Sequence, residues 1–516
     1  MTGGGRAKSA GASSTGGFVS GSHHGNAERG GRLETASTSD GLVGRFRAWA
    51  HSGTALALLV VALFALNAAL HYPGLMNNDS INQYAEAVKG EFTDWHPPVM
   101  AWLWSYVRLL GDGPGPFLLL HLAAYWAGFG LFADAVRRLG RPRLSWLVAL
   151  AGAFPPFLYI NATVMKDVGM VAFWLAAVGY LFWIRSQNRR VPVIGWFVVA
   201  ALLAYGVLVR GNAVFGFGPL LVYALAPTTW LRTGRLMIAA VLVAVLAIPA
   251  SQVVNRLLFD AAGRSPAHSL FLFDLMGIAR HTGDPAVIAP RATLSAADLK
   301  ECYTPYWWDS LSPWGRCGSR VSRPDPAFVA SGDGLPAQWA GAIAAHPLAY
   351  AVHRLKHFNS ALLFAVPLKH IRFTPEYRTG DPAFAPMEVV TERDIKLDLL
   401  RKSPVIWPVV WIVWAVTLVI FAARLGPERH VFLARVLLVS ALGYSGAYLV
   451  IGVATDMRYH YWSLIAILLS SVLLLPELAQ AFRKKSALLF SGLAAVVVVT
   501  GVGVLTRVFD FQAFVL

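Results

Sequence analysis

Residues 71–99 read HYPGLMNNDSINQYAEAVKGEFTDWHPPV and follow the first long apolar segment of the chain. The acids Asp79, Glu86 and Asp94 and the imidazole of His96 lie in this stretch. Ionisable side chains next to a membrane are costly, and they usually mark positions with a function. The apolar segments on either side of this stretch decide the fold, and its acids are the first candidates for a functional site.

The composition excludes an ordinary soluble protein. Of the 516 residues, 56% are hydrophobic and only 14% are charged, which leaves too little polar surface to cover a soluble core. The formal net charge is +16, but many basic residues punctuate apolar segments, as they do in the cytoplasmic loops of polytopic membrane proteins. We therefore expect an integral membrane protein that does not bind nucleic acid.

Segments of about 20 apolar residues, the length that crosses a bilayer as a helix, recur along the chain. Eleven spans are expected, at residues 52–72, 115–135, 144–162, 167–185, 192–209, 212–229, 235–254, 404–423, 431–453, 461–478 and 487–507. A shorter apolar helix at 99–110 is expected at the interface. Lysine and arginine clusters fall on one side of these spans, which places the N-terminus in the cytoplasm and the C-terminus outside.

The predicted fold is an all-α polytopic membrane protein in four parts. Residues 1–48 are rich in Gly, Ser and Thr and are expected to form a disordered cytoplasmic tail. Residues 49–254 form a seven-helix module that includes the first external loop, 73–114. Residues 255–403 form a large external cap segment with an interfacial helix, and residues 404–516 form a four-helix transmembrane module.

The first external loop predicts a short helix that ends at Gly90. Asp79, Gln83 and Glu86 share one face of this helix. Asp79 has a second interpretation as the N-cap of the helix, which would also hold its carboxylate rigidly. The sequence therefore predicts a carboxylate face that points toward an external vestibule.

The same loop ends in FTDWHPP at residues 92–98. The two prolines fix the backbone and start the next helix. Asp94 and His96 are thereby held just before the N-terminus of that helix. Together with Asp79, they are the candidate ligands of a possible divalent metal.

External loops should be poor in cations, yet Lys89, Lys166, Arg210 and Arg458 lie in them. Cations that converge near lipid headgroups are what a phosphate-bearing lipid requires. The alternative is that each cation neutralises a neighbouring acid or reaches out to the headgroups. We expect at least one of the last three to contact a phosphate.

The cap segment contains HPLAYAVHRLKHFNSALLF at residues 346–364, whose aliphatic stripe predicts a helix lying on the membrane. His353 and His357 have the spacing of a zinc pair, but no third ligand at a fixed spacing accompanies them. We therefore favour an interpretation in which Arg354 faces a lipid phosphate.

Cys302 and Cys317 lie on the predicted external side and are expected to form a disulfide. The aromatic residues near them predict either a lid over a substrate or the core of a small cap: Tyr303, Tyr306, Trp307, Trp308 and Trp314.

This layout resembles the GT-C superfamily of polyprenyl-phosphate-dependent glycosyltransferases, which includes protein O-mannosyltransferases and aminoarabinose transferases. The resemblance covers about residues 50–510. It rests on a first-loop acid (Asp79, followed by Asp94), a second-loop lysine (Lys166), a third-loop arginine (Arg210), a large external segment and a late D-x-R-Y turn (Asp456 to Tyr459). The sequence Asn77-Asn78-Asp79-Ser80 departs from the paired acids of some branches, which leaves metal dependence as an alternative.

The resemblance implies an inverting glycosyltransferase of a bacterial inner membrane, with its site facing outward among membrane lipids. The implied donor is a polyprenyl-phosphate-linked sugar, and the acceptor is a lipid, a glycan or a protein. Asp79 and Asp94 are the implied catalytic residues, and the sugar or acceptor is expected at Gln83, Trp95 and His96. The lipid phosphate is expected at Lys166, Arg210, Arg354, Arg458, Tyr459 and His460.

Two other classes compete with this interpretation. A transporter or flippase is disfavoured because the sequence shows no internal repeat and no paired broken helices. A lipid-linked glycan polymerase or ligase would rely on arginines and histidines in the large external loop rather than on a first-loop acid.

Overall fold

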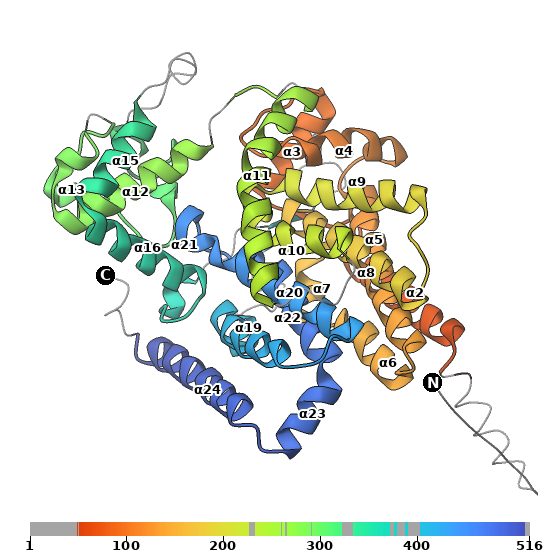
Figure 1. The fold of residues 1–516 in the computed structure, drawn as a ribbon. Coiled ribbons are helices and arrows are strands. Elements are labelled where there is room, and N and C mark those ends of the chain that lie inside the picture. Colours follow the sequence, from red (N-terminus) through yellow and green to blue (C-terminus); the bar gives the residue numbers. More distant parts are fainter. Residues whose placement is uncertain are drawn as a thin grey trace, which may run out of the picture. The chain divides into compact units, whose positions relative to one another are not determined.

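The computed structural model describes residues 49, 51–226, 233–259, 261–263, 266–289, 291–321, 334–371, 376–378, 388–390 and 403–510. In this part the chain is mostly helical (Figure 1). The tail expected at residues 1–48 and several stretches of the cap segment lie outside the described residues.

The helices fall into three groups along the chain. The first contains α2 (Gly53–His71), α3 (Asn78–Lys89), α4 (Val99–Val107), α5 (Gly115–Arg138), α6 (Pro142–Ala151), α7 (Pro155–Ile160), α8 (Lys166–Ser186), α9 (Val193–Val209), α10 (Val214–Leu225) and α11 (Thr233–Phe259). The second contains α12 (Ala267–Thr282), α13 (Ala296–Cys302), α15 (Leu335–Ala345) and α16 (Pro347–Ala361). The third contains α19 (Pro408–Ala423), α20 (Arg429–Gly446), α21 (Tyr448–Ile451), α22 (Tyr461–Leu473), α23 (Leu475–Arg483) and α24 (Ala487–Val508).

Several of these helices can cross a bilayer. Among the described residues, 5 helices are long and apolar enough, and a bent pair formed by Met457–Leu473 and Leu475–Arg483 raises the number to 6. Shorter apolar helices, including α4, α9, α10 and α19, accompany them. The predicted class, a helical polytopic membrane protein, is confirmed, whereas the eleven spans and their orientation stay predictions.

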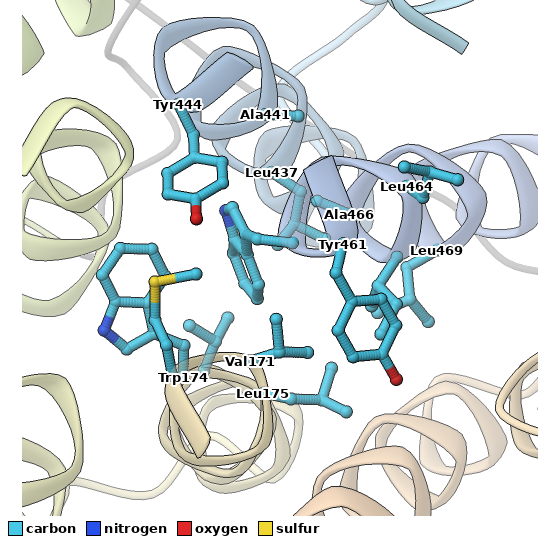
Figure 2. Close-up of a cluster of buried hydrophobic side chains, with 14 of the residues drawn as sticks. Val171, Trp174, Leu175, Leu437, Ala441, Tyr444, Tyr461, Leu464, Ala466 and Leu469 are labelled. Atoms are coloured by element: carbon cyan, nitrogen blue, oxygen red, sulfur yellow. The ribbon is translucent and has the colours of Figure 1, made fainter. Parts of the chain in front are cut away.

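Helix α8 lies at the centre of the core. In the most apolar 18-residue stretch of α8, 83% is buried. The corresponding share is 17% in α2 and in α24, whose apolar side chains are therefore mostly exposed. Small residues let helices approach closely in membranes, and a Cβ added at Gly128 of α5 would lie 2.7 Å from Cγ of Leu175. Figure 2 shows the side chains that α8, α20 and α22 contribute to this core, among them Trp174, which packs edge-on against Trp462.

A small antiparallel sheet connects the first external loop to the cap segment. Strand β1 (Leu75–Met76) pairs with β2 (Glu376–Arg378), which pairs with β3 (Glu388–Val390). Strand β1 also bonds to the segment that precedes α8. The Leu75 N–H donates to the carbonyl of Ala162, and the Val164 N–H donates to the carbonyl of Leu75, both at 2.8 Å. These main-chain bonds hold the start of α3 beside the start of α8.

The cap helices α12, α13, α15 and α16 pack on one another (Figure 1). Helices α12, α13 and α15 share a hydrophobic cluster of their own. Cys302 and Cys317 form a disulfide within this cluster, with their Cα atoms 5.8 Å apart, as predicted. The aliphatic stripe of α16 is exposed at Leu348, Val352 and Leu355. Contact of that stripe with a membrane stays a prediction.

Candidate active site

Helix α3 places Asp79 within its first turn. The N-cap is Asn77, whose Oδ1 accepts a hydrogen bond from the Ser80 N–H at 3.0 Å. The alternative prediction, that Asp79 is the N-cap of this helix, is therefore wrong. The helix ends as predicted at Gly90, which has a φ of 74° that glycine adopts without strain. Because Asn77 satisfies the backbone donor, the Asp79 carboxylate is left available for other contacts.

Three separate parts of the chain bring positive or imidazole groups to Asp79. Its Oδ2 lies 3.5 Å from Nζ of Lys166, the first residue of α8, and 3.6 Å from Nη2 of Arg458 in the late turn. Its Oδ1 lies 4.0 Å from Nε2 of His96. The Asp79 side chain keeps 32% of its surface exposed, so the cluster can be reached from outside the protein.

The neighbours of Asp79 control its charge. Burial raises its pKa, but the charges of Lys166 and Arg458 act in the opposite direction, and the net pKa lies well below the ordinary value for an aspartate. Burial, reinforced by Lys166, lowers the pKa of His96 to about 3. At neutral pH the site therefore contains an ionised carboxylate and a neutral imidazole.

The tautomer of His96 follows from its contact with Lys166. Nδ1 of His96 lies 3.0 Å from Nζ of Lys166, and an ammonium group can only donate. Nδ1 therefore accepts, and the proton of the neutral ring is on Nε2, the nitrogen that faces Asp79. This buried Nε2 has no hydrogen-bond partner among the described residues. A hydroxyl group placed between it and the carboxylate would bond to both.

Arg210 and Tyr459 form a second layer behind this cluster. The Nε of Arg210 lies 3.2 Å from Oδ1 of Asp167. The Tyr459 ring is close to two guanidinium groups, with its centroid 4.6 Å from Cζ of Arg210 and 5.3 Å from Cζ of Arg458. Asp456 pairs with the Nε of Arg458 at 3.0 Å. The two arginines are thus held rigidly by aromatic and acidic partners.

Other predicted site residues make different contacts. Arg354 pairs with Asp274 inside the cap. His460 is fully buried, with Nδ1 2.8 Å from Oγ of Ser445 and Nε2 3.1 Å from the Ala361 carbonyl. Both ring nitrogens of His460 are therefore occupied by structural partners.

Gln83 and Asp94 are held in part through main-chain groups. The Gln83 Nε2 donates to the Asp79 carbonyl at 3.2 Å, and its buried Oε1 has no partner among the described residues. The backbone N–H of Asp94 donates to the carbonyl of Ala262 at 3.0 Å. Gln83 thus fixes the backbone at Asp79, and Asp94 anchors the loop to the segment that follows α11.

The aromatic residues of the cap segment were predicted to form either a lid over a substrate or the core of the cap, and they divide between these two positions. The Trp95 ring lies 6.0 Å from Trp308 and 6.2 Å from Trp314 between centroids, next to His96. Tyr303 instead contacts His353 in the cap interior. Part of the cluster therefore forms an aromatic surface beside the site, and part of it belongs to the core of the cap.

Two acids of the cap segment near the site were missed in the sequence. Burial and the charge of Asp79 raise the pKa of Asp309, which follows Trp308. Burial raises the pKa of Glu376 to about 7, although Thr163 donates a hydrogen bond to its Oε2 at 2.8 Å. The β1–β2 pairing and the hydrogen bond from Thr163 place Glu376 here. A three-residue strand inside a long loop leaves no signal in the sequence.

The described residues do not fit a metal site. No group of three or more His, Cys, Asp and Glu side chains in this part of the chain lies close enough to hold an ion. Asp79 and His96 face each other, but two cations lie within 4 Å of the same carboxylate, and they would repel a divalent metal. His353 and His357 are no zinc pair either, since one faces Asp274 and the other the Pro305 carbonyl.

The fold and the site together define a polytopic membrane protein that holds a partly exposed carboxylate beside a lysine and an arginine. Residues 95–252 match the family described as dolichyl-phosphate-mannose-protein mannosyltransferase, which confirms the predicted resemblance. The match includes Lys166 and Arg210 and begins after Asp79. It indicates a membrane glycosyltransferase. No curated protein and no solved structure matches the chain.

Proposed function

We propose that this protein transfers a sugar from a polyprenyl-phosphate donor to a hydroxyl group of a lipid, glycan or protein acceptor. The observation that carries the proposal is the position of Asp79 between Lys166 and Arg458, with the Nε2–H of His96 directed at the same carboxylate. This arrangement offers a base for a hydroxyl next to cations for a phosphate. The basic residues of the opposite loops support a site that faces outward from a bacterial inner membrane.

The reaction is a single displacement with inversion at the anomeric carbon. The acceptor hydroxyl lies between Asp79 and His96, donates to the carboxylate and accepts from Nε2–H. As its oxygen bonds to the anomeric carbon, its proton passes to Asp79. The bond from the anomeric carbon to the phosphate oxygen breaks, and the electron pair leaves with the phosphate. Lys166 and Arg458 stabilise the negative charge that develops there.

Donor binding would also activate the base. In the free protein the cations hold the pKa of Asp79 well below its ordinary value, which makes the carboxylate a weak base. A phosphate beside Lys166 and Arg458 neutralises part of their charge, so the pKa of Asp79 rises toward its ordinary value. The carboxylate therefore becomes an effective base only when the leaving group is in place.

The surrounding residues position the two substrates. Arg210 is already paired with Asp167, and it orients Tyr459 and, through it, Arg458. Trp95, with Trp308 and Trp314, offers an aromatic surface on which a sugar ring can pack. These residues would hold the transferred sugar beside the Asp79 carboxylate.

The test is a purified-protein assay with a polyprenyl-phosphate sugar that measures released polyprenyl phosphate. Replacing Asp79 by Asn should lower the rate by roughly 10²- to 10⁴-fold, the usual contribution of a general base. Glu91→Gln, which changes an exposed acid of the same loop, is the matched control and should keep the wild-type rate. Near-full activity of folded Asp79→Asn would remove Asp79 from the chemistry. A transporter would release no polyprenyl phosphate, and a ligase would require a diphosphate-linked glycan.

A further inference from the structure

A second charged cavity lies at the other end of α8. It has a volume of about 510 Å³ and is formed where α8 ends, α9 begins, α10 ends and α20 begins. Four arginines line it, together with aromatic side chains: Arg185, Arg189, Arg190 and Arg429. No acid lines it among the residues that the structure describes. The proposed transfer reaction uses none of them.

Two of these arginines are fixed without being neutralised. Arg185 donates to the carbonyls of Tyr223 at 2.6 Å and of Ala224 at 2.8 Å, at the end of α10. Arg429 donates to the Arg185 carbonyl and to Oδ1 of Asn188, both at 2.5 Å. Carbonyl groups at helix ends carry only partial charges. The cavity therefore keeps a preorganised positive charge.

The other two arginines are free to bind a ligand. Arg189 and Arg190 are exposed on the short connection between α8 and α9. In the part of the chain that the structure describes, no acid forms an ion pair with either of them. Phosphate groups are the ligands that clustered guanidinium groups bind best, because each offers several acceptor oxygens.

The position of the cavity identifies the source of the phosphate. Helix α8 runs for 21 residues from Lys166 in the candidate active site to Ser186 beside the cavity, a length of about 30 Å that equals the hydrocarbon thickness of a bilayer. The cavity therefore lies at the opposite membrane boundary. Next to it, α9 exposes Val193, Ile194 and Phe197, which form an apolar wall for acyl chains.

We propose that this cavity binds the phosphate headgroup of an anionic phospholipid from the leaflet opposite the active site. The headgroup lies among the four arginines, and the acyl chains lie along α9. The proposal does not depend on the transfer reaction, because it involves none of the residues around Asp79.

The test uses the full-length protein, stripped of lipid in detergent. Phosphatidylglycerol, phosphatidylcholine and inorganic phosphate are added separately, and bound lipid is measured by native mass spectrometry beside the midpoint of thermal unfolding. Phosphatidylglycerol should bind and raise the midpoint. The double variant Arg189→Gln/Arg190→Gln should bind it roughly 30-fold more weakly, since each basic residue contributes about fivefold. Arg483→Gln/Lys484→Gln removes two exposed charges elsewhere and should bind like the wild type.

Three results would overturn the proposal. Equal binding of phosphatidylcholine would show that acyl chains suffice, and an equal shift with inorganic phosphate would show a site for a free anion. Unchanged phosphatidylglycerol binding in the Arg189→Gln/Arg190→Gln variant would place the lipid elsewhere. Sugar transfer by this variant in detergent should equal that of the wild type, which separates this site from the proposed active site.

Discussion

Two clusters in this protein combine an aspartate, a histidine and an arginine, and they are built in opposite ways. In the cap, Asp274 accepts from His353 at 3.1 Å and from Trp339 at 2.8 Å, and it also pairs with Arg354. Its side chain is 0% exposed. The carboxylate of Asp79 is partly exposed, and its nearest ionic partners lie at 3.5 to 4.0 Å.

The difference separates a closed structural cluster from an open one that suits the proposed reaction. Asp274 has satisfied acceptors, and such a network makes a core rigid and specific. The contacts of Asp79 are longer than hydrogen bonds, so a substrate hydroxyl can bind without first breaking one. The two clusters are also linked, because Arg354 donates to the Gly452 carbonyl at 2.6 Å, ahead of the turn that contains Asp456 and Arg458.

After the loss of Asp79 itself, the largest expected effect would come from removing a cation of the partly exposed Asp79 cluster. Lys166→Gln should lower kcat by about 10²- to 10³-fold, the usual loss when one donor to a developing negative charge is removed. The pKa of Asp79 should also rise, which moves the acidic limb of the pH–rate profile to higher pH. Lys89→Gln removes an exposed cation at the end of α3 and should leave kcat unchanged. An unaltered pH–rate profile in Lys166→Gln would show that the charge of Lys166 does not control the pKa of Asp79.

Changes in the buried cluster of Asp274, His353 and Arg354 should lower the stability of the protein rather than its kcat. Asp274→Asn leaves Arg354 and its charge buried without a counter-ion, at a cost of about 3 to 5 kcal/mol. The midpoint of thermal unfolding in detergent should fall, while the folded fraction keeps most of its kcat. Asp284→Asn, an exposed acid of the cap, is the control. If Asp274→Asn lost kcat at wild-type stability, the cap cluster would belong to the chemistry.

Glu376 allows a test by pH. Its pKa is raised from the ordinary value of 4.5 to about 7, so the folded state binds a proton more tightly than the unfolded state does. Stability should therefore fall as the pH rises from about 4.5 to 7. Glu376→Gln should lose this dependence and become more stable than the wild type above pH 7 by up to about 3 kcal/mol. Parallel stability curves for the two proteins would show that Glu376 ionises normally.

The smallest expected effect concerns the aromatic surface. Trp95→Ala removes one ring of the Trp95, Trp308 and Trp314 cluster, and it should raise KM by about two- to tenfold with little change in kcat. Trp102→Ala, which changes a partly exposed indole of α4, is the comparison. A loss confined to kcat would assign Trp95 to the reaction step instead of to binding.

The sequence was most informative where one strong physical rule applied. Bilayer length and charge cost predicted the helical membrane class and marked Asp79, Lys166 and Arg458, which the structure places together. The buried partners of Arg354 and His460 could not be predicted, because Asp274 and Ala361 lie far away from them in the chain. Glu376 and Asp309 were missed because short segments of a long loop place them, and no periodicity marks such segments.

Main-chain hydrogen bonds determine where the Asp79 carboxylate lies. Leu75 exchanges amide bonds with Ala162 and Val164, and bonds of this kind form whatever side chains flank them. Substitutions in the side chains around the site could therefore change which acceptor the proposed reaction takes, while the Asp79 carboxylate keeps its position.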